Sequence, residues 1–150
     1  MHLLLLFWAT PIHISGIEQP ILAAHNSIRA RVGVPSLTWA KWLAEIAQKR
    51  ADELISSGEF SHHRNWSFGE NLYEITGEAA KPREVVLDWA SEMVDYSYAG
   101  NSCRKACGHY TQLVWRNTTR VGCAASRAGA RTVVVCEYDP PGNFVGERPY

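Results

Sequence analysis

The stretch 121-VGCAASRAGARTVVVCEY-138 contains the clearest structural signal in this chain of 150 residues. It holds two short apolar runs, 121–126 and 132–138, separated by residues that include Gly129. Such runs on either side of a glycine-containing turn predict a β-hairpin. Cys123 and Cys136 lie at equal distances from the middle of the turn, so they oppose each other, and opposed Cα atoms at about 4.5–5.5 Å suit a disulfide. We therefore predict a Cys123–Cys136 disulfide.

The remaining cysteines, Cys103 and Cys107, are predicted to bond to each other, which leaves no odd thiol in the chain. An alternative is that they bind zinc as thiolates together with His109, in a C-x3-C-x-H pattern. Pairing is preferred because thiolate zinc sites usually add a second, distant Cys/His pair, and the other two cysteines already face each other.

Helical spacing of apolar residues precedes the hairpin. One helix is predicted over 20–32, with His25 on its buried stripe, and a second from Thr38 as N-cap to about Gly58. The segment 60–81 is polar and interrupted by glycines, so it is predicted to be a long loop. The hairpin therefore follows a mainly helical half of the chain.

A third helix is predicted to begin at Pro82 and to carry Trp89, Met93 and Tyr96 along one apolar stripe. At 3.6 residues per turn, Glu92 projects close to the edge of that stripe. It is the acidic residue of this helix that we expect to be partly buried.

The composition favours one compact domain. There are 15 basic and 15 acidic residues, 46% hydrophobic residues and 20% charged residues, which excludes a disordered chain. Zero formal charge and the lack of a Lys/Arg run argue against binding to nucleic acid or to a membrane surface.

An apolar run, LLLLFWA, occupies positions 3–9 and is followed by Pro11 and by a small pair at 15–16. We interpret 1–16 as a signal peptide or its remnant, and 17–150 as a single domain. A buried strand or an expression artefact is the alternative. The run is far shorter than the ~20 residues that span a bilayer, and no later stretch comes closer, so no transmembrane segment is expected.

Common catalytic templates are absent from the sequence: it has no P-loop, dinucleotide fingerprint, HExxH helix or G-x-S-x-G elbow. What remains is a scattered set of histidines and glutamates at His62, His63, Glu70, Glu92 and His109. Each of these, taken alone, is more readily explained as a structural core or surface residue than as a functional one.

Four motifs in order carry a family resemblance: HNSIR at 25–29, GENL at 69–72, GHYTQLVWRNT at 108–118 and CEYDPPGNF at 136–144. Together they resemble the CAP superfamily of cysteine-rich secretory, antigen 5 and pathogenesis-related class 1 proteins, whose module is also called the SCP domain. The resemblance spans about 20–150. The ending, PPGNFVGERPY, looks most like the pathogenesis-related class 1 branch.

The resemblance implies an α+β fold, an α-β-α sandwich with a central antiparallel sheet between helical layers. It also implies a central cavity with two histidines and two glutamates, which map by motif onto His62, Glu70, Glu92 and His109. His62 is preferred to His63 because Phe-Ser-His matches the family's aromatic-x-His pattern.

Two interpretations of this tetrad remain open. Imidazole nitrogens and carboxylate oxygens suit zinc or another divalent cation, although the resemblance implies no required cofactor. Alternatively, the glutamates hold the histidines by hydrogen bonds without any metal. Two cysteines common in the family are missing here, and Glu137 adds a carboxylate where the family usually has a neutral or basic polar residue.

The resemblance implies a secreted, extracellular and non-enzymatic protein that acts in defence or signalling, as a monomer with a sterol, lipid or receptor partner. The aromatic residues Tyr73, Trp66, Tyr96 and Tyr98 are candidates for an apolar groove. One alternative is a metal- or His/Glu-dependent hydrolase, because acids and imidazoles in one cavity can perform acid–base chemistry. Another is a precursor whose residues 140–150 are released as a signalling peptide.

Overall fold

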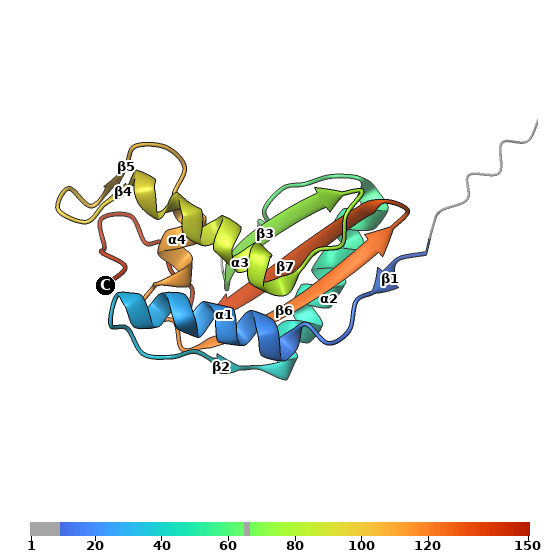
Figure 1. The fold of residues 1–150 in the computed structure, drawn as a ribbon, viewed down its shortest axis with the longest axis horizontal. Coiled ribbons are helices and arrows are strands. Elements are labelled where there is room, and N and C mark those ends of the chain that lie inside the picture. The colour runs from blue at the N-terminus through green and yellow to red at the C-terminus, as the bar shows by residue number, and fades with distance from the viewer. Residues whose placement is uncertain (1–9, 65–66) are drawn as a thin grey trace, which may run out of the picture.

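The structure is a computed structural model that describes residues 10–64 and 67–150. The apolar run at 3–9 and Trp66, both discussed above, lie outside the described residues. The elements in chain order are β1 Ile12–His13, α1 Glu18–Arg31, β2 Thr38–Trp39, α2 Lys41–Ser57, β3 Gly69–Thr76, α3 Pro82–Ser91, the 3-10 helix η1 Glu92–Asp95, β4 Tyr96–Ser97, β5 Ser102–Cys103, α4 Gly108–Leu113, β6 Arg120–Ala128 and β7 Arg131–Asp139 (Figure 1).

The predicted hairpin is the centre of the main sheet. β6 and β7 pair antiparallel with Cys123 opposite Cys136, and these two residues form the predicted disulfide. β3 adds to the free side of β7, also antiparallel, and sets Glu70 opposite Glu137. The other side of β6 takes two short strands, β1 antiparallel near one end and β2 parallel near the other.

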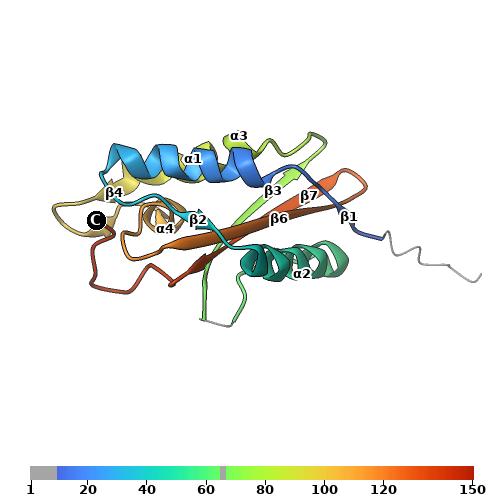
Figure 2. The same cartoon turned by 90° about the horizontal axis from the view of Figure 1, so that it is seen from below.

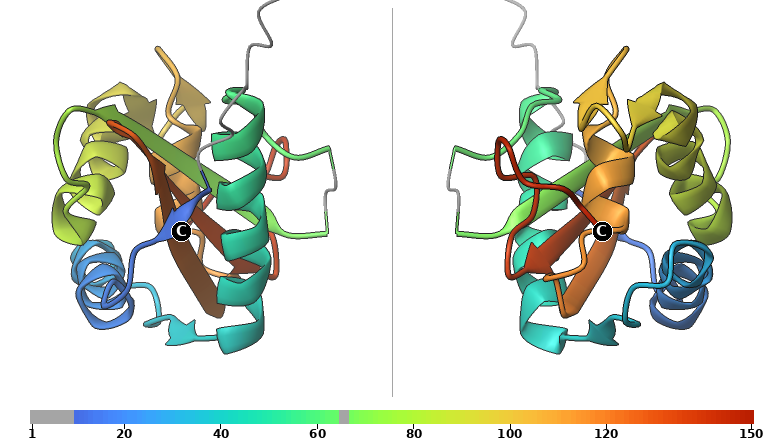
Figure 3. Two further views of the ribbon diagram at one scale, coloured as in Figure 1. Left: turned by 90° about the vertical axis from the view of Figure 1, so that its right-hand side faces the viewer. Right: turned by 90° about the vertical axis from the view of Figure 1, so that its left-hand side faces the viewer.

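Helices cover both faces of this sheet. α1, α3 and α4 share one buried cluster with a face of the sheet, and α2 packs on the opposite face (Figure 2). Figure 3 shows α2 on one face of the sheet and α1 and α3 on the other. Successive strand residues point to opposite faces, so Cys136 and Tyr138 face α1 while Val135 faces α2. The arrangement is the expected α-β-α sandwich.

Arg29 of α1 ties several loops to this core. Its guanidinium is buried and donates to the backbone carbonyls of Pro35, Leu113, Trp115 and Thr118. Burial lowers the pKa of Arg29 to about 10, so it remains charged at neutral pH. Arg29 thereby provides a donor for the carbonyls of Pro35, Leu113 and Thr118, and a second donor for the carbonyl of Trp115, which also accepts the backbone N–H of Thr118.

Two of the predicted boundaries are wrong. Thr38 does not cap a helix, because Thr38–Trp39 pairs with β6 and α2 begins at Lys41. The third helix stops at Ser91 and gives way to the tighter η1, which leaves Met93 52% exposed rather than on a buried stripe. The stop at Gly58 is confirmed, since this residue adopts the left-handed conformation that ends helices.

The predicted long loop 60–81 is also wrong, because it contains the eight-residue strand β3. The short helix α4 follows the Cys103–Cys107 disulfide and was not predicted from the sequence. Within residues 10–64 and 67–150, no helix has the length and apolar character that crossing a membrane requires.

Candidate functional site

A cavity of about 430 Å³ opens where β3 begins, between the loop before β3, η1, α4 and the C-terminal tail. It brings all four residues of the predicted tetrad into one lining. The lining residues are His62, His63, Phe68, Gly69, Glu70, Asn71, Glu92, Ala106, Gly108, His109, Gln112, Pro141, Gly142, Asn143 and Phe144.

One half of the tetrad joins η1 to α4. Oε1 of Glu92 lies 2.7 Å from Nδ1 of His109, and Oε2 accepts the backbone N–H groups of His109 at 2.9 Å and Tyr110 at 3.1 Å. A carboxylate at this position satisfies amides that the first turn of a helix leaves unpaired. Glu92 is therefore the N-terminal cap of α4 as well as the partner of His109, and its side chain is 19% exposed.

The other half joins the loop before β3 to the strand itself. Nδ1 of His62 lies 2.9 Å from Oε1 of Glu70, and the same oxygen accepts the backbone N–H of His63 at 3.0 Å. Of the two adjacent histidines, it is the ring of His62 that bonds to Glu70. The side chain of Glu70 is only 8% exposed, whereas that of His62 is 61% exposed.

The two halves face each other across the cavity. The ring centroids of His62 and His109 are 6.3 Å apart, and Trp89 stacks against His109 with centroids 6.2 Å apart. Trp89 is itself buried and donates its indole N–H to the carbonyl of Leu72. His109 is thus held by a carboxylate and by a fixed aromatic ring, while His62 stands on an exposed loop.

A second carboxyl group lies behind Glu70. Glu137 is its cross-strand partner, is 5% exposed, and lines an adjoining cavity of about 310 Å³ together with Arg50 and Phe68. Burial, followed by the charge of Glu70, raises the pKa of Glu137 to about 8. Glu137 is therefore mostly protonated at neutral pH.

The pKa of Glu70 moves the other way. Burial alone would raise it, but hydrogen bonds from His62 and His63 and the charge of Arg50 outweigh burial and lower the pKa. Nε of Arg50 lies 3.3 Å from Oε2 of Glu70. The cavity therefore holds Glu70 as a carboxylate beside a protonated Glu137.

The hydrogen bonds of the two histidines determine which of their nitrogens could bind a metal. Both Nδ1 atoms of the tetrad are engaged by carboxylates, so a metal would bind through the two Nε2 atoms, with Glu70 and Glu92 orienting the rings. A carboxylate on the second ring nitrogen is the usual support of a metal-binding histidine. The residues present thus fit a divalent cation with two imidazole ligands.

The C-terminal tail forms one wall of the cavity. The backbone N–H of Gly142 donates to Gln112 at 3.0 Å, and the Asn143 amide donates to the carbonyl of Gly108 at 2.9 Å. The Thr111 hydroxyl lies 2.7 Å from Oδ1 of Asn143. These contacts fasten the tail to α4, the helix that carries His109.

The expected aromatic groove is occupied by the chain itself. Tyr98 stacks on the C-terminal Tyr150 with ring centroids 5.1 Å apart, and Tyr96 also contacts that ring. Tyr73 lies in β3 and packs against the core. Tyr96 and Tyr98 therefore anchor the tail, and none of the three tyrosines lines the tetrad cavity.

The alternative zinc site at Cys103, Cys107 and His109 is wrong, because the two sulfurs are bonded to each other. Sequence reasoning also missed two features of the site. It did not place Arg50 beside Glu70, although both the charge and the helical face were readable, and it did not foresee that 141–144 would line the cavity.

The sequence of this chain is similar to known proteins of one family. Residues 22–138 match the family described as "CAP: Cysteine-rich secretory protein family". Over 141 residues the chain is 38% identical to pathogenesis-related protein 1 of Arabidopsis thaliana, covering 93% of this chain and 86% of the relative. It is 43% identical over 136 residues to pathogenesis-related protein 1A of Nicotiana tabacum, covering 89% and 80%.

Solved structures share the fold. Schistosoma mansoni venom allergen-like protein 4 superposes with a TM-score of 0.75 at 26% identity, covering 91% of this chain and 95% of that one. NaASP2, solved with Zn²⁺, gives a TM-score of 0.76 at 21% identity, covering 92% and 86%. The chain therefore belongs to the CAP family of cysteine-rich secretory proteins, in its pathogenesis-related class 1 branch.

Proposed function

We propose that this protein is a secreted, non-catalytic defence protein whose cavity binds a divalent cation through Nε2 of His62 and Nε2 of His109. Glu70 and Glu92 orient the two rings. The observation that carries the proposal is the pair of Nδ1–carboxylate contacts, at 2.9 and 2.7 Å, on histidines that face one cavity. Two disulfides and the pathogenesis-related relatives support an extracellular role.

Zinc is the cation to test first. Imidazole is among its preferred ligands, and the NaASP2 structure, whose likeness to this chain shows the fold alone, contains Zn²⁺. Two protein ligands make a weak site with coordination positions left for water or a ligand oxygen. When bound, the ion would supply a Lewis-acidic position at the floor of the cavity.

The cavity walls favour a small, partly apolar ligand. Phe68, Ala106, Pro141 and Phe144 contribute apolar lining, and the amides of Asn71 and Asn143 in the same lining are held by hydrogen bonds within the protein. A volume of about 430 Å³ falls within the ~300–1,000 Å³ typical of small-molecule pockets. A sterol or another lipid is the ligand class that we propose for it.

A hydrolase remains the second candidate because a metal-activated water could act between the two histidines. The described lining contains no serine, threonine or cysteine, which disfavours a nucleophilic mechanism. We therefore favour binding over catalysis.

The metal proposal is tested by titrating the oxidised, metal-free protein with Zn²⁺ in a calorimeter at pH 7.5. Wild type and His63→Ala, the matched control, should bind one ion per chain, and His62→Ala and His109→Ala should bind at least ~10-fold more weakly. Equal binding by wild type and His109→Ala would refute the site.

The ligand proposal is tested separately with a fluorescent sterol. Phe144→Ser, which removes an apolar wall, should reduce binding several-fold, whereas Val145→Ser, a change at the neighbouring and fully exposed position, should not. Binding that is unchanged in Phe144→Ser would place any sterol site elsewhere on the protein.

A further inference from the structure

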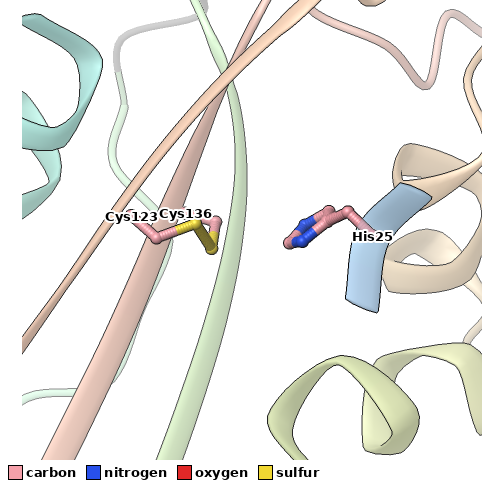
Figure 4. Close-up of side chains that lie close together, drawn as sticks. All are labelled: His25, Cys123 and Cys136. Atoms are coloured by element: carbon pink, nitrogen blue, oxygen red, sulfur yellow. A yellow bond between two sulfur atoms is a disulfide. The ribbon is translucent and has the colours of Figure 1, made fainter. Parts of the chain in front are cut away.

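A second cluster of metal-binding atoms lies in the core, away from the tetrad cavity. The imidazole of His25 and the sulfurs of Cys123 and Cys136 offer three ligand atoms that all lie within 4.8 Å of one another, and all three residues are buried. Among the residues that the structure describes, this is the one such group of three or more. In Figure 4 the His25 ring projects from α1 toward the disulfide.

The hydrogen bonds of His25 fix which nitrogen could bind a metal. Nδ1 lies 2.7 Å from the carbonyl oxygen of Ile21, which can only accept, so Nδ1 carries the proton. Nε2 therefore has a free electron pair, and the Tyr138 hydroxyl, 2.8 Å away, donates to it. A backbone carbonyl on the second nitrogen is a recurrent support of metal-binding histidines.

The two cysteine sulfurs are the other possible metal ligands, and they come from the sheet. Cys123 and Cys136 are directly opposed on β6 and β7, and both point to the face that α1 covers. In the oxidised protein their sulfurs are bonded to each other and offer no thiolate. Reduction would leave two thiols side by side, facing the imidazole.

We propose that reducing the Cys123–Cys136 disulfide creates a zinc site formed by Nε2 of His25 and the two thiolates. A dithiol reductant supplies two electrons and two protons, the S–S bond breaks, two thiols form, and the reductant becomes a disulfide. Zinc then displaces one proton from each thiol. The Tyr138 hydroxyl, which donates to Nε2 of His25 in the oxidised protein, would have to give up that hydrogen bond.

Charge balance favours zinc at this depth. The two thiolates balance the two positive charges of Zn²⁺, and the imidazole is neutral, so the loaded site carries no net charge. An ion without such ligands would be costly to bury. Sulfur and nitrogen are also the ligands that structural zinc prefers. The ion would link β6, β7 and α1 in the reduced chain, in which the disulfide no longer joins β6 to β7.

The test uses the full chain with Cys103→Ser/Cys107→Ser, so that Cys123 and Cys136 are the sole thiols. The protein is unfolded and reduced with a phosphine, then refolded without oxygen, with or without Co²⁺ as a spectroscopic substitute for zinc. We expect one thiolate-bound Co²⁺ per chain, separate from any ion in the tetrad cavity, with thiolate-to-cobalt charge-transfer absorption that is lost when Zn²⁺ is added.

Three variants assign the ligands. Cys123→Ser should abolish the charge-transfer absorption, and His25→Leu, which keeps the core apolar, should weaken Co²⁺ binding at least ~10-fold. Tyr138→Phe should retain binding, because it frees Nε2 without removing a ring. If His25→Leu does not refold, the other two variants still test the site.

Several outcomes would overturn the proposal: no thiolate absorption in the refolded chain, unchanged absorption in Cys123→Ser, or failure to refold even with Co²⁺. His109→Ala serves as the control for the tetrad cavity and should leave this signal intact. Because the cavity is tested in oxidised protein and this site in reduced protein, either proposal can fail without the other.

Discussion

Replacing Glu137 by glutamine should change how stability depends on pH. Glu137 is 5% exposed and its folded-state pKa is about 8, against an ordinary value of 4.5. Between these two values the folded protein keeps a proton that the unfolded chain gives up, so the stability of the wild type falls as pH rises. Glutamine resembles the protonated acid, keeps a donor toward Glu70, and does not titrate.

The size of the effect follows from the pKa difference. One pH unit within the window corresponds to about 1.4 kcal/mol, which limits the loss at pH 7 to about 3 kcal/mol. The two carboxyl groups interact with each other and adjoin a cavity, which reduces this figure. We expect the wild type to lose about 2 kcal/mol relative to Glu137→Gln between pH 5 and pH 8.

Guanidinium unfolding of both proteins from pH 5 to pH 9, without reductant, measures the difference directly. Glu45→Gln, a change at an exposed position of α2, is the matched control and should follow the wild type. A difference between wild type and Glu137→Gln that stays constant within about 0.5 kcal/mol across this range would show that Glu137 is ionised throughout, and the reasoning would fail.

Three further changes test the scaffold. Arg29→Met should cost at least about 3 kcal/mol of unfolding free energy, because the carbonyls of Pro35, Leu113 and Thr118 lose their side-chain donor, and urea denaturation should show this. Gly142→Ala places a Cβ 2.6 Å from Cγ of Trp115, so we expect a loss of about 1–3 kcal/mol and a lower melting temperature. Removing the short Cys103–Cys107 loop with serines should cost only about 2 kcal/mol in non-reducing guanidinium; a larger loss would mean that this disulfide holds more than its own loop.

The parts of the fold that the sequence predicted have local causes. The hairpin could be predicted because apolar runs, a glycine turn and two symmetric cysteines all agree. The end of α2 could be predicted because Gly58 is a typical stop. Glu92 could be singled out because helical periodicity places it at the edge of an apolar stripe, and it is indeed half-buried.

The missed elements depend on residues far away in the chain. α4 is six residues long, and its first turn is capped by Glu92, which lies 17 positions before His109. The neighbouring sequence therefore contains no signal that predicts this helix. β3 begins with polar residues at 70 and 71, whose partners come from β7 and from α4. Local pattern alone therefore described 60–81 as a loop.

The candidate site shows the same division. The four tetrad positions came from the family resemblance, because no spacing rule links His62 to His109. The pairing of Glu70 with Glu137 requires the register of β3 on β7, and the placement of Arg50 requires the packing of α2 on that face. These contacts are tertiary and could not be read from the sequence.

The way the tail is fastened restricts what one molecule can do. Residues 141–144 line the tetrad cavity, and Tyr150 stacks on Tyr98 and meets the ring of Tyr96 edge-on. If the last eleven residues were released as a signalling peptide, the remaining protein would lose the wall of the cavity that residues 141–144 form. One molecule could then release the signalling peptide or hold a ligand in the intact cavity, but it could not do both.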